Sequence, residues 1–305
     1  MSLPSPFKTP EGEATFIAAY NAAMKLWPMP YEERDIPTRF GTTHVVITGH
    51  RNAPPLVLLH GYMGTLTSWA PNIADFSQDH RVYAIDVMGQ PGKSIPDEPV
   101  RNDDDYDAWL TATLNGLHLG RVSLVGMSFG GWIPLNYAAA EPERVRKLVL
   151  LSPGGLLRIN RQFSLRGMLM VFFPTRFTVN SFMRWAGFST EPGKNDARPI
   201  VNVMYLGMKH FQIPKDTLRI AAAPLSDYDL RKMHVPTLLL FGENEVLCDP
   251  AKAMARARRL IRDLQGELVP SSSHDMCVSQ RAIVDARIHE FLRDTRHNVP
   301  ARDVA

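Results

Sequence analysis

Short runs of almost wholly apolar residues recur along the chain, and each run is bounded by Gly, Pro or Asp. They are LVLLHG (56–61), VYAID (82–86), VSLVGMS (122–128), KLVLLSP (147–153), TLLLFGE (237–243) and GELVP (266–270). An apolar run of this length without alternation is typical of a strand that is buried on both faces. The pattern therefore predicts six interior strands of one sheet.

Helical patterns separate most of these runs, for example at residues 103–120 and 131–145. Strands that alternate with helices form crossover units, which give a mainly parallel sheet covered by helices. Ahead of them we expect an amphipathic helix over residues 13–27 and a strand at 43–50, paired with residues 34–40. The predicted fold class is α/β.

The alternation stops between Gly154 and about Ser226, where the sequence is rich in Met and aromatic residues. An insertion at the carboxyl end of a strand lies where α/β sheets bind their ligands. We therefore predict an α/β core formed by residues 1–153 and 227–305, and a helical cap formed by residues 154–226.

Two other interpretations of this insertion stay open. It could pack against the core for stability alone. A lid that adheres to a membrane is less favoured, because the apolar run is interrupted by Arg161, Arg166, Arg176 and Arg184.

Composition and charge limit the classes of partner that this chain is expected to bind. The chain has 305 residues, a formal net charge of +3, and 45% apolar residues, which is ordinary for a soluble protein. Its densest basic cluster, residues 252–263, has helical spacing and no nucleic-acid motif, so no nucleic-acid partner is expected.

No signal peptide or transmembrane segment is predicted. Cys248 and Cys277 are too few for a disulfide framework, so we expect a cytoplasmic protein, although a bridge between these two stays possible.

Ser128 is the candidate nucleophile, in the pentapeptide GMSFG at residues 126–130. A strand pattern precedes it and a helical pattern follows, which is the context of a sharp strand-to-helix turn with small flanking glycines. A serine on such a turn needs a histidine as base and an acid that orients the histidine. In chain order, the acid comes after a later strand and the histidine comes after the last strand. His274, in VPSSSHDM, is the histidine in that position. For the acid, the spacing after Gly242 favours Glu245, with Asp249 as the alternative.

Acyl transfer also needs donors for an oxyanion. We expect them to be the backbone N–H groups of Phe129 and Tyr62, with His60 holding the loop that carries Tyr62. The predicted substrate pocket is lined by Tyr62, Phe129, Leu156, Phe172 and Phe173. No metal or organic cofactor is needed for this chemistry, and the cluster of His274, Asp275 and Cys277 lacks the spacing of a zinc site.

With these motifs assigned, the chain resembles the α/β-hydrolases over nearly its whole length. The matching stretches are HGYMG (60–64), GMSFGG (126–131), LRKMHVPTLLLFGENE (230–245) and SSSHD (271–275). FGENEVLCDP (241–250) is similar to bacterial carboxylesterases of the naproxen-esterase type. Two residues depart from the commoner pattern, Glu245 in place of Asp and Ser273 in place of Gly.

The resemblance implies a helical cap that forms the acyl pocket, and hydrolysis of carboxylic esters, including 2-arylpropionate esters, with water as the second substrate. Haloalkane dehalogenases and epoxide hydrolases have an aspartate nucleophile where this chain has Ser128, so the resemblance excludes these two activities. C–C bond hydrolases, perhydrolases and acyltransferases have a serine at this position, so these three activities remain alternatives to ester hydrolysis. A ligand receptor with slow turnover is an alternative of another class. The natural ester and the oligomeric state stay open too.

Overall fold

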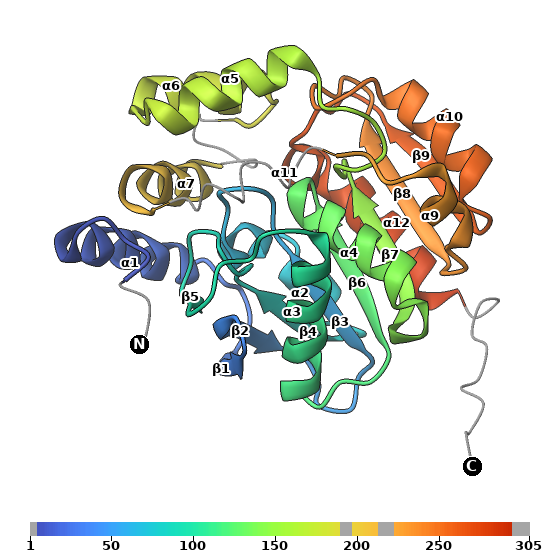
Figure 1. The fold of residues 1–305 in the computed structure, drawn as a ribbon, viewed down its shortest axis with the longest axis horizontal. Helices are drawn as coiled ribbons and strands as arrows, with labels where there is room; N and C mark the ends of the chain where they lie inside the picture. Colours follow the sequence, from blue (N-terminus) through green and yellow to red (C-terminus); the bar gives the residue numbers. More distant parts are fainter. Residues whose placement is uncertain (1–4, 190–196, 213–222, 295–305) are drawn as a thin grey trace.

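One twisted sheet forms the centre of the molecule (Figure 1). The computed structural model describes residues 5–189, 197–212 and 223–294. Within them, nine strands follow the order β1-β2-β4-β3-β6-β7-β8-β9, with β5 paired to β2. The strands are β1 (Tyr31–Thr38), β2 (Gly41–Thr48), β3 (Pro55–Leu59), β4 (Arg81–Ile85), β5 (Ile95–Pro96), β6 (Val122–Met127), β7 (Val145–Leu151), β8 (Thr237–Gly242) and β9 (Leu264–Val269).

The six apolar runs of the sequence correspond to β3, β4, β6, β7, β8 and β9, and neighbouring strands among these six are parallel. The prediction of a mainly parallel sheet is therefore confirmed. The predicted hairpin is also present, because β1 pairs with β2 in antiparallel register. β2 then joins the sheet antiparallel to β4. All the parallel strands end at the same edge, so the loops after β3, β6, β7 and β8 come together there.

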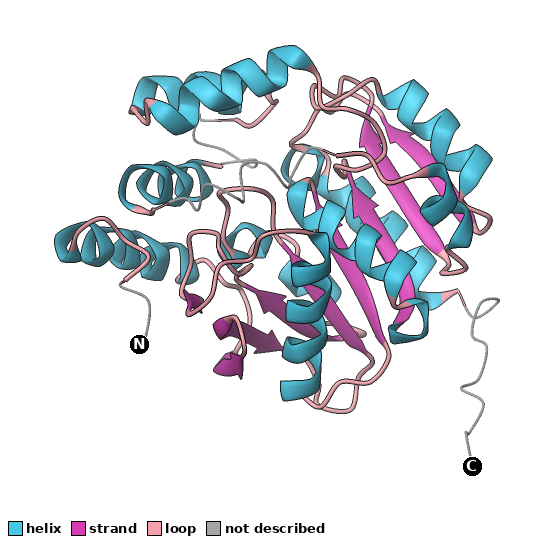
Figure 2. Ribbon diagram, in the orientation of Figure 1, coloured by secondary structure: helices cyan, strands magenta, loops and turns pink. Residues whose placement is uncertain are grey.

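Helices cover both faces of the sheet (Figure 2). One face carries α3 (Asp103–Gly116), α4 (Phe129–Ala140), α9 (Asp227–Lys232) and α10 (Pro250–Leu260), and the other carries α1 (Pro10–Met24), α2 (Ile73–Phe76) and α12 (Arg281–Arg293). Successive residues of a strand point to opposite faces. Val57 of β3 accordingly packs in one cluster, and its neighbour Leu58 packs in the other. The burial of apolar side chains on both faces explains why these strands consist mostly of apolar residues.

The described residues of the predicted cap, which precede α9, form three helices, and we call them the cap helices. They are α5 (Arg161–Phe172), α6 (Arg176–Trp185) and α7 (Arg198–His210). Figure 1 shows α5 and α6 at the outer edge of the molecule, with α7 between them and α1. Side chains of the cap helices, among them Val179, Met183 and Val201, form a third apolar cluster together with Met63 of the loop after β3. Residues 190–196 and 213–222 of the predicted cap lie outside the described residues.

Two simpler expectations can be compared with the structure. Cys248 and Cys277 are both free and buried, so the disulfide that the sequence left possible is not formed. None of the helices in the described ranges is both long and apolar enough to cross a bilayer.

Candidate active site

Ser128 lies on a strained turn between β6 and α4. Its backbone φ of 57° and ψ of −117° lie outside the regions that most residues adopt. The turn is held by backbone hydrogen bonds, because Ser128 donates its N–H to Leu151 and its carbonyl accepts from Gly154. The strain keeps the serine hydroxyl at the end of the parallel strands, where a nucleophile is needed.

The flanking glycines are required by close contacts with backbone. A Cβ atom on Gly126 would lie 1.9 Å from the carbonyl oxygen of Gly130. A Cβ atom on Gly130 would lie 2.2 Å from the carbonyl oxygen of His60. Both distances are far below van der Waals contact, so the turn can form only with glycine at these two positions.

His274 and Glu245 form a buried pair. The Nδ1 atom of His274 lies 2.9 Å from Oε1 of Glu245. The Glu245 carboxylate also accepts hydrogen bonds from the N–H groups of Val246 and Leu247, each at 2.8 Å, and from the hydroxyl of Ser152. These bonds fix the ring and leave its other nitrogen, Nε2, to face away from the carboxylate.

The pair shifts both pKa values in the direction of an ion pair. Burial alone would lower the pKa of His274, but the Glu245 carboxylate raises it above its ordinary value. Burial alone would raise the pKa of Glu245, but the His274 ring and the hydrogen bonds from Ser152 and Leu247 hold it below its ordinary value. Glu245 is therefore placed where a carboxylate can stabilise an imidazolium at His274.

Asp249, the alternative acid, is occupied elsewhere. It is the N-cap of α10, where its carboxylate accepts the N–H of Lys252 at 3.0 Å, and its side chain is 43% exposed. Of the two candidates, the structure brings Glu245 to His274.

The loop after β3 presents backbone amides beside Ser128. His60 is buried, with Nδ1 donating to the carbonyl of Gly61 at 2.9 Å and Nε2 accepting from the N–H of Val87 at 3.0 Å. Burial lowers the pKa of His60, so its ring is neutral and serves to hold the loop. Among the described residues, the N–H groups of Tyr62 and Phe129 have no hydrogen-bond acceptor. These two amides are therefore available to an oxyanion.

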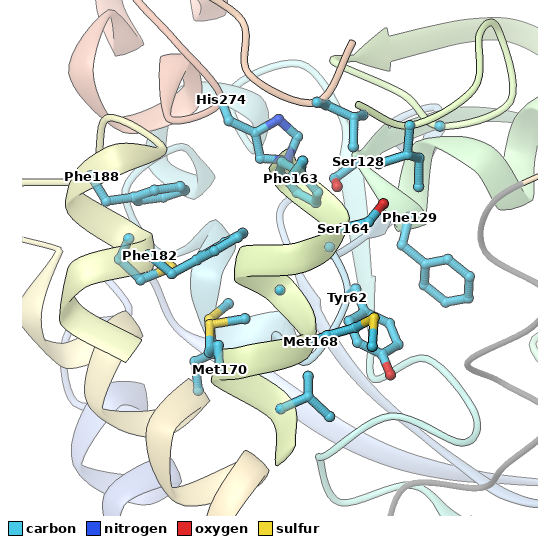
Figure 3. A pocket seen from close by; sticks show the side chains of 18 of the residues that line it. Tyr62, Ser128, Phe129, Phe163, Ser164, Met168, Met170, Phe182, Phe188 and His274 are labelled. Atoms are coloured by element: carbon cyan, nitrogen blue, oxygen red, sulfur yellow. The ribbon is translucent and has the colours of Figure 1, made fainter. Parts of the chain in front are cut away.

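A cavity of about 320 Å³ opens at Ser128 and His274, which lie at the same end of it (Figure 3). Its described lining side chains carry no charge apart from that of His274. The ring of Phe163, on α5, lies edge-on to His274 at 5.7 Å. Among the described residues the Ser128 hydroxyl has no hydrogen bond to His274. Such catalytic contacts often tighten only when substrate binds.

The predicted pocket residues divide into two groups. Tyr62, Phe129 and Phe172 line the cavity. The prediction was wrong for Leu156, which is fully buried in the core beneath α4 and gives its carbonyl to Arg256. It was also wrong for Phe173, which is absent from the lining and is 65% exposed, because α5 ends at Phe172 and the chain turns outward there.

A protein-family model described as "alpha/beta hydrolase fold" matches residues 54–279 of this chain. The chain belongs to the α/β-hydrolase family. The uncharacterized carboxylesterase nap of Bacillus subtilis is 32% identical over 281 residues, which is 90% of this chain and 91% of the relative. Carboxylesterase YbfK of the same organism is 29% identical over 94% of this chain and 96% of its own. The crystal structure of naproxen esterase from Bacillus subtilis superimposes with a TM-score of 0.85 at 32% identity, covering 93% of this chain and 99% of that one.

Two contacts of this α/β-hydrolase site were missed in the sequence. Ser152 directly follows β7 in the stretch LLSPGG, and the sequence predicts no role for it. Its position directly after a strand that neighbours β8 was the available signal, because such residues meet at one edge of the sheet. Phe163 gave no comparable signal, since the sequence of α5 does not reveal which of its faces turns toward His274.

Proposed function

We propose that this protein is a serine carboxylesterase that hydrolyses apolar, uncharged esters through Ser128, His274 and Glu245. The observation that carries the proposal is that Ser128, on a strained turn, and His274, which pairs with the buried Glu245, line the same apolar cavity. The relatives that match over most of this chain are themselves named carboxylesterases, which supports the same chemistry.

The roles follow from the geometry. His274 takes the hydroxyl proton of Ser128 as the serine oxygen attacks the ester carbonyl, and the N–H groups of Tyr62 and Phe129 stabilise the resulting oxyanion. The carbonyl re-forms as the C–O bond to the alcohol breaks, and His274 gives that alcohol its proton. A water molecule then loses a proton to His274 and attacks the acyl-enzyme. The carboxylic acid leaves, and Ser128 recovers its proton.

The cavity favours a bulky apolar acyl or alcohol group. Phe163 and Phe182 contact one another edge-on, with ring centroids 5.2 Å apart, and both line the cavity together with Met170. Aromatic edges and a thioether pack well against an aryl ring. 2-Arylpropionate esters, expected from the resemblance to naproxen-esterase-type enzymes, fit this description.

Turnover of a short p-nitrophenyl ester tests the proposal. We expect many turnovers per chain for the wild type, and a loss of several orders of magnitude for Ser128→Ala, since removal of a triad serine costs roughly 10⁶-fold elsewhere. Asp249→Asn serves as the matched control, because Asp249 is exposed at the start of α10. Fewer than one turnover per chain would exclude the esterase and favour a ligand receptor.

A racemic ester of naproxen then tests the acyl preference. The expected result is hydrolysis at a rate comparable with that of an unbranched aliphatic ester of similar size. Hydrolysis of the aliphatic ester alone would leave the carboxylesterase proposal intact and remove the arylpropionate part.

A further inference from the structure

Six large apolar side chains on α5, on α6 and in the turn between these helices face solvent. They are Leu165, Met168, Leu169, Phe172, Phe173 and Phe177, and each is more than half exposed. These six, called the cap patch below, are half of the twelve large hydrophobic side chains that are exposed in the described part of the chain. Scattered exposed apolar residues are ordinary, but a cluster of this kind marks a surface where another apolar body docks.

The cap patch follows from the periodicity of α5. Leu165, Met168, Leu169 and Phe172 are three or four residues apart, so they lie on one face of the helix. Met170 lies on the opposite side and is buried. A surface helix normally turns polar residues outward. The outward face of α5 is instead a second apolar stripe, and α5 and α6 lie at the outer edge of the molecule (Figure 1).

The charged side chains of the segment that carries the cap patch have a single sign. Residues 154–189 contain five arginines and no Asp or Glu. Arg161 and Arg176 are the first residues of α5 and α6, and Arg184 lies in the last turn of α6. All three are exposed, and none pairs with a carboxylate among the described residues.

These arginines interrupt the apolar run in the sequence, but in the structure they lie in the first or last turns of the helices. The fifth arginine, Arg158, is exposed and precedes α5. The guanidinium groups of Arg166 and Arg176 lie over the rings of Trp185 and Tyr205, at 4.8 and 4.7 Å from the ring centres. The sequence argument against a membrane-adhering cap therefore does not hold.

The catalytic cavity opens at the cap patch. Met168 and Phe172 belong to the patch, and they also line the cavity that contains Ser128 and His274. An apolar molecule that lay against the patch would thus have a direct path to the nucleophile. Met168 and Phe172 thus join the patch to the cavity, and arginines stand in the end turns of the helices that carry the patch.

The single sign of the charge selects the occupant. A two-fold dimer formed through this patch would place each copy's arginines against those of the other, with no carboxylate from residues 154–189 between them. An anionic lipid surface matches both features of this face. Its acyl chains can take up the apolar side chains, and its headgroups attract the arginines.

We infer that α5 and α6 dock on an anionic lipid surface, with the cap patch among the acyl chains and the arginines at the headgroups. The docked face carries the mouth of the cavity. If the carboxylesterase function proposed above is correct, the ester substrates are amphiphiles that enter the cavity from that surface. Docking itself requires no hydrolysis.

Co-sedimentation of the full chain with lipid vesicles tests the inference. One set of vesicles is phosphatidylcholine alone, and the other contains roughly a third phosphatidylglycerol. We expect binding to the second set, weaker at high salt, and little binding to the first. The variant Arg158→Gln/Arg161→Gln/Arg184→Gln should partition roughly 100-fold less, given the usual effect of three basic residues at such a surface.

An apolar variant and a matched control distinguish docking through the cap patch from non-specific adsorption to vesicles. Leu165→Ser/Leu169→Ser/Phe177→Ser removes patch residues that do not line the cavity, and it should lose vesicle binding. Leu26→Ser/Tyr228→Ser removes two comparably exposed residues elsewhere, and it should bind as the wild type does. Hydrolysis of a soluble p-nitrophenyl ester without vesicles should be unchanged in all three variants.

The possible failures are distinguishable. A wild type that binds neither vesicle overturns the docking inference. If that protein is also a dimer in solution, and the apolar variant a monomer, the patch is an interface between two copies. A wild type that binds vesicles but does not turn over the soluble ester supports docking and contradicts the esterase function.

Discussion

The hydroxyl of Ser152, at the end of β7, donates a hydrogen bond to Oε2 of Glu245, which follows β8. The other carboxylate oxygen, Oε1, accepts from His274 and from the N–H groups of Val246 and Leu247. Ser152 is fully buried and has a positive φ of 43°. The acid is therefore held at both oxygens, and its longer side chain is positioned by a residue from the neighbouring strand.

Ser152→Ala should lower kcat about tenfold with little change in KM. A hydrogen bond to a charged group contributes roughly 1.5–3 kcal/mol, and its loss leaves Oε2 of Glu245 buried without a donor. Without this donor the carboxylate is held less firmly in the position that contacts His274, so it stabilises the imidazolium less well. The measurement is kcat and KM for a p-nitrophenyl ester across pH. In the variant, kcat at the alkaline plateau should be lower, and the midpoint of the rise in kcat should lie at lower pH.

A double variant separates this positioning role from a general structural effect. If Ser152 acts through the carboxylate, Ser152→Ala should cost much less in a Glu245→Gln background than in the wild type. Equal losses in both backgrounds would contradict the assigned role.

Glu245→Gln should reduce kcat by roughly 10⁴-fold, as the loss of charge on a triad acid does elsewhere. Asp249→Asn should change kcat less than about twofold, since that side chain only caps α10 at the surface. Steady-state kinetics on the two variants give the comparison, with circular dichroism as a check that each is folded. A ranking in which Asp249→Asn is the worse variant would reassign the acid.

The sheet and the triad candidates could be predicted because both depend on local patterns. Interior strands show as apolar runs, and a strained serine turn needs glycine at fixed positions such as 126 and 130. His274 and Glu245 follow from the order in which parallel strands end at one edge.

The pocket could not be predicted, because its shape depends on how the cap helices rotate. Phe172 and Phe173 are adjacent in sequence, yet only Phe172 lines the cavity, since α5 ends between them. Leu156 follows the strand β7 closely and was expected at the site, but the chain there turns into the core. Sequence spacing does not determine either outcome.

Activity should depend on the protonation of His274. The base must be neutral to accept a proton, and Glu245 raises the pKa of His274 above its ordinary value of about 6.5. We therefore expect kcat/KM to rise with pH, and to reach half its plateau above about pH 6.5. In Glu245→Gln the imidazolium loses its partner, so the midpoint should move to lower pH while the plateau falls. An unchanged midpoint would contradict the coupling of the two side chains.

Asp285→Asn should stabilise the fold at alkaline pH. Asp285, on α12, is buried beside Asn72, whose Nδ2 donates to its Oδ1 at 2.8 Å. Burial and the nearby Asp75 raise the pKa of Asp285 to about 8, whereas an unfolded chain gives about 3.9. Between these values the native state holds a proton that the unfolded state lacks, so the free energy of unfolding falls as pH rises.

Asparagine resembles the protonated carboxyl and does not titrate. The variant should therefore melt at a higher temperature than the wild type at about pH 9, and the difference should shrink toward about pH 4. Thermal unfolding followed by circular dichroism across this range gives the measurement, with Glu98→Gln, at an exposed site, as the control. Parallel profiles for the wild type and Asp285→Asn would show that Asp285 is already ionised in the native state. In that case α12 is held against α2 by a charged carboxylate, and the variant should be the less stable protein at every pH.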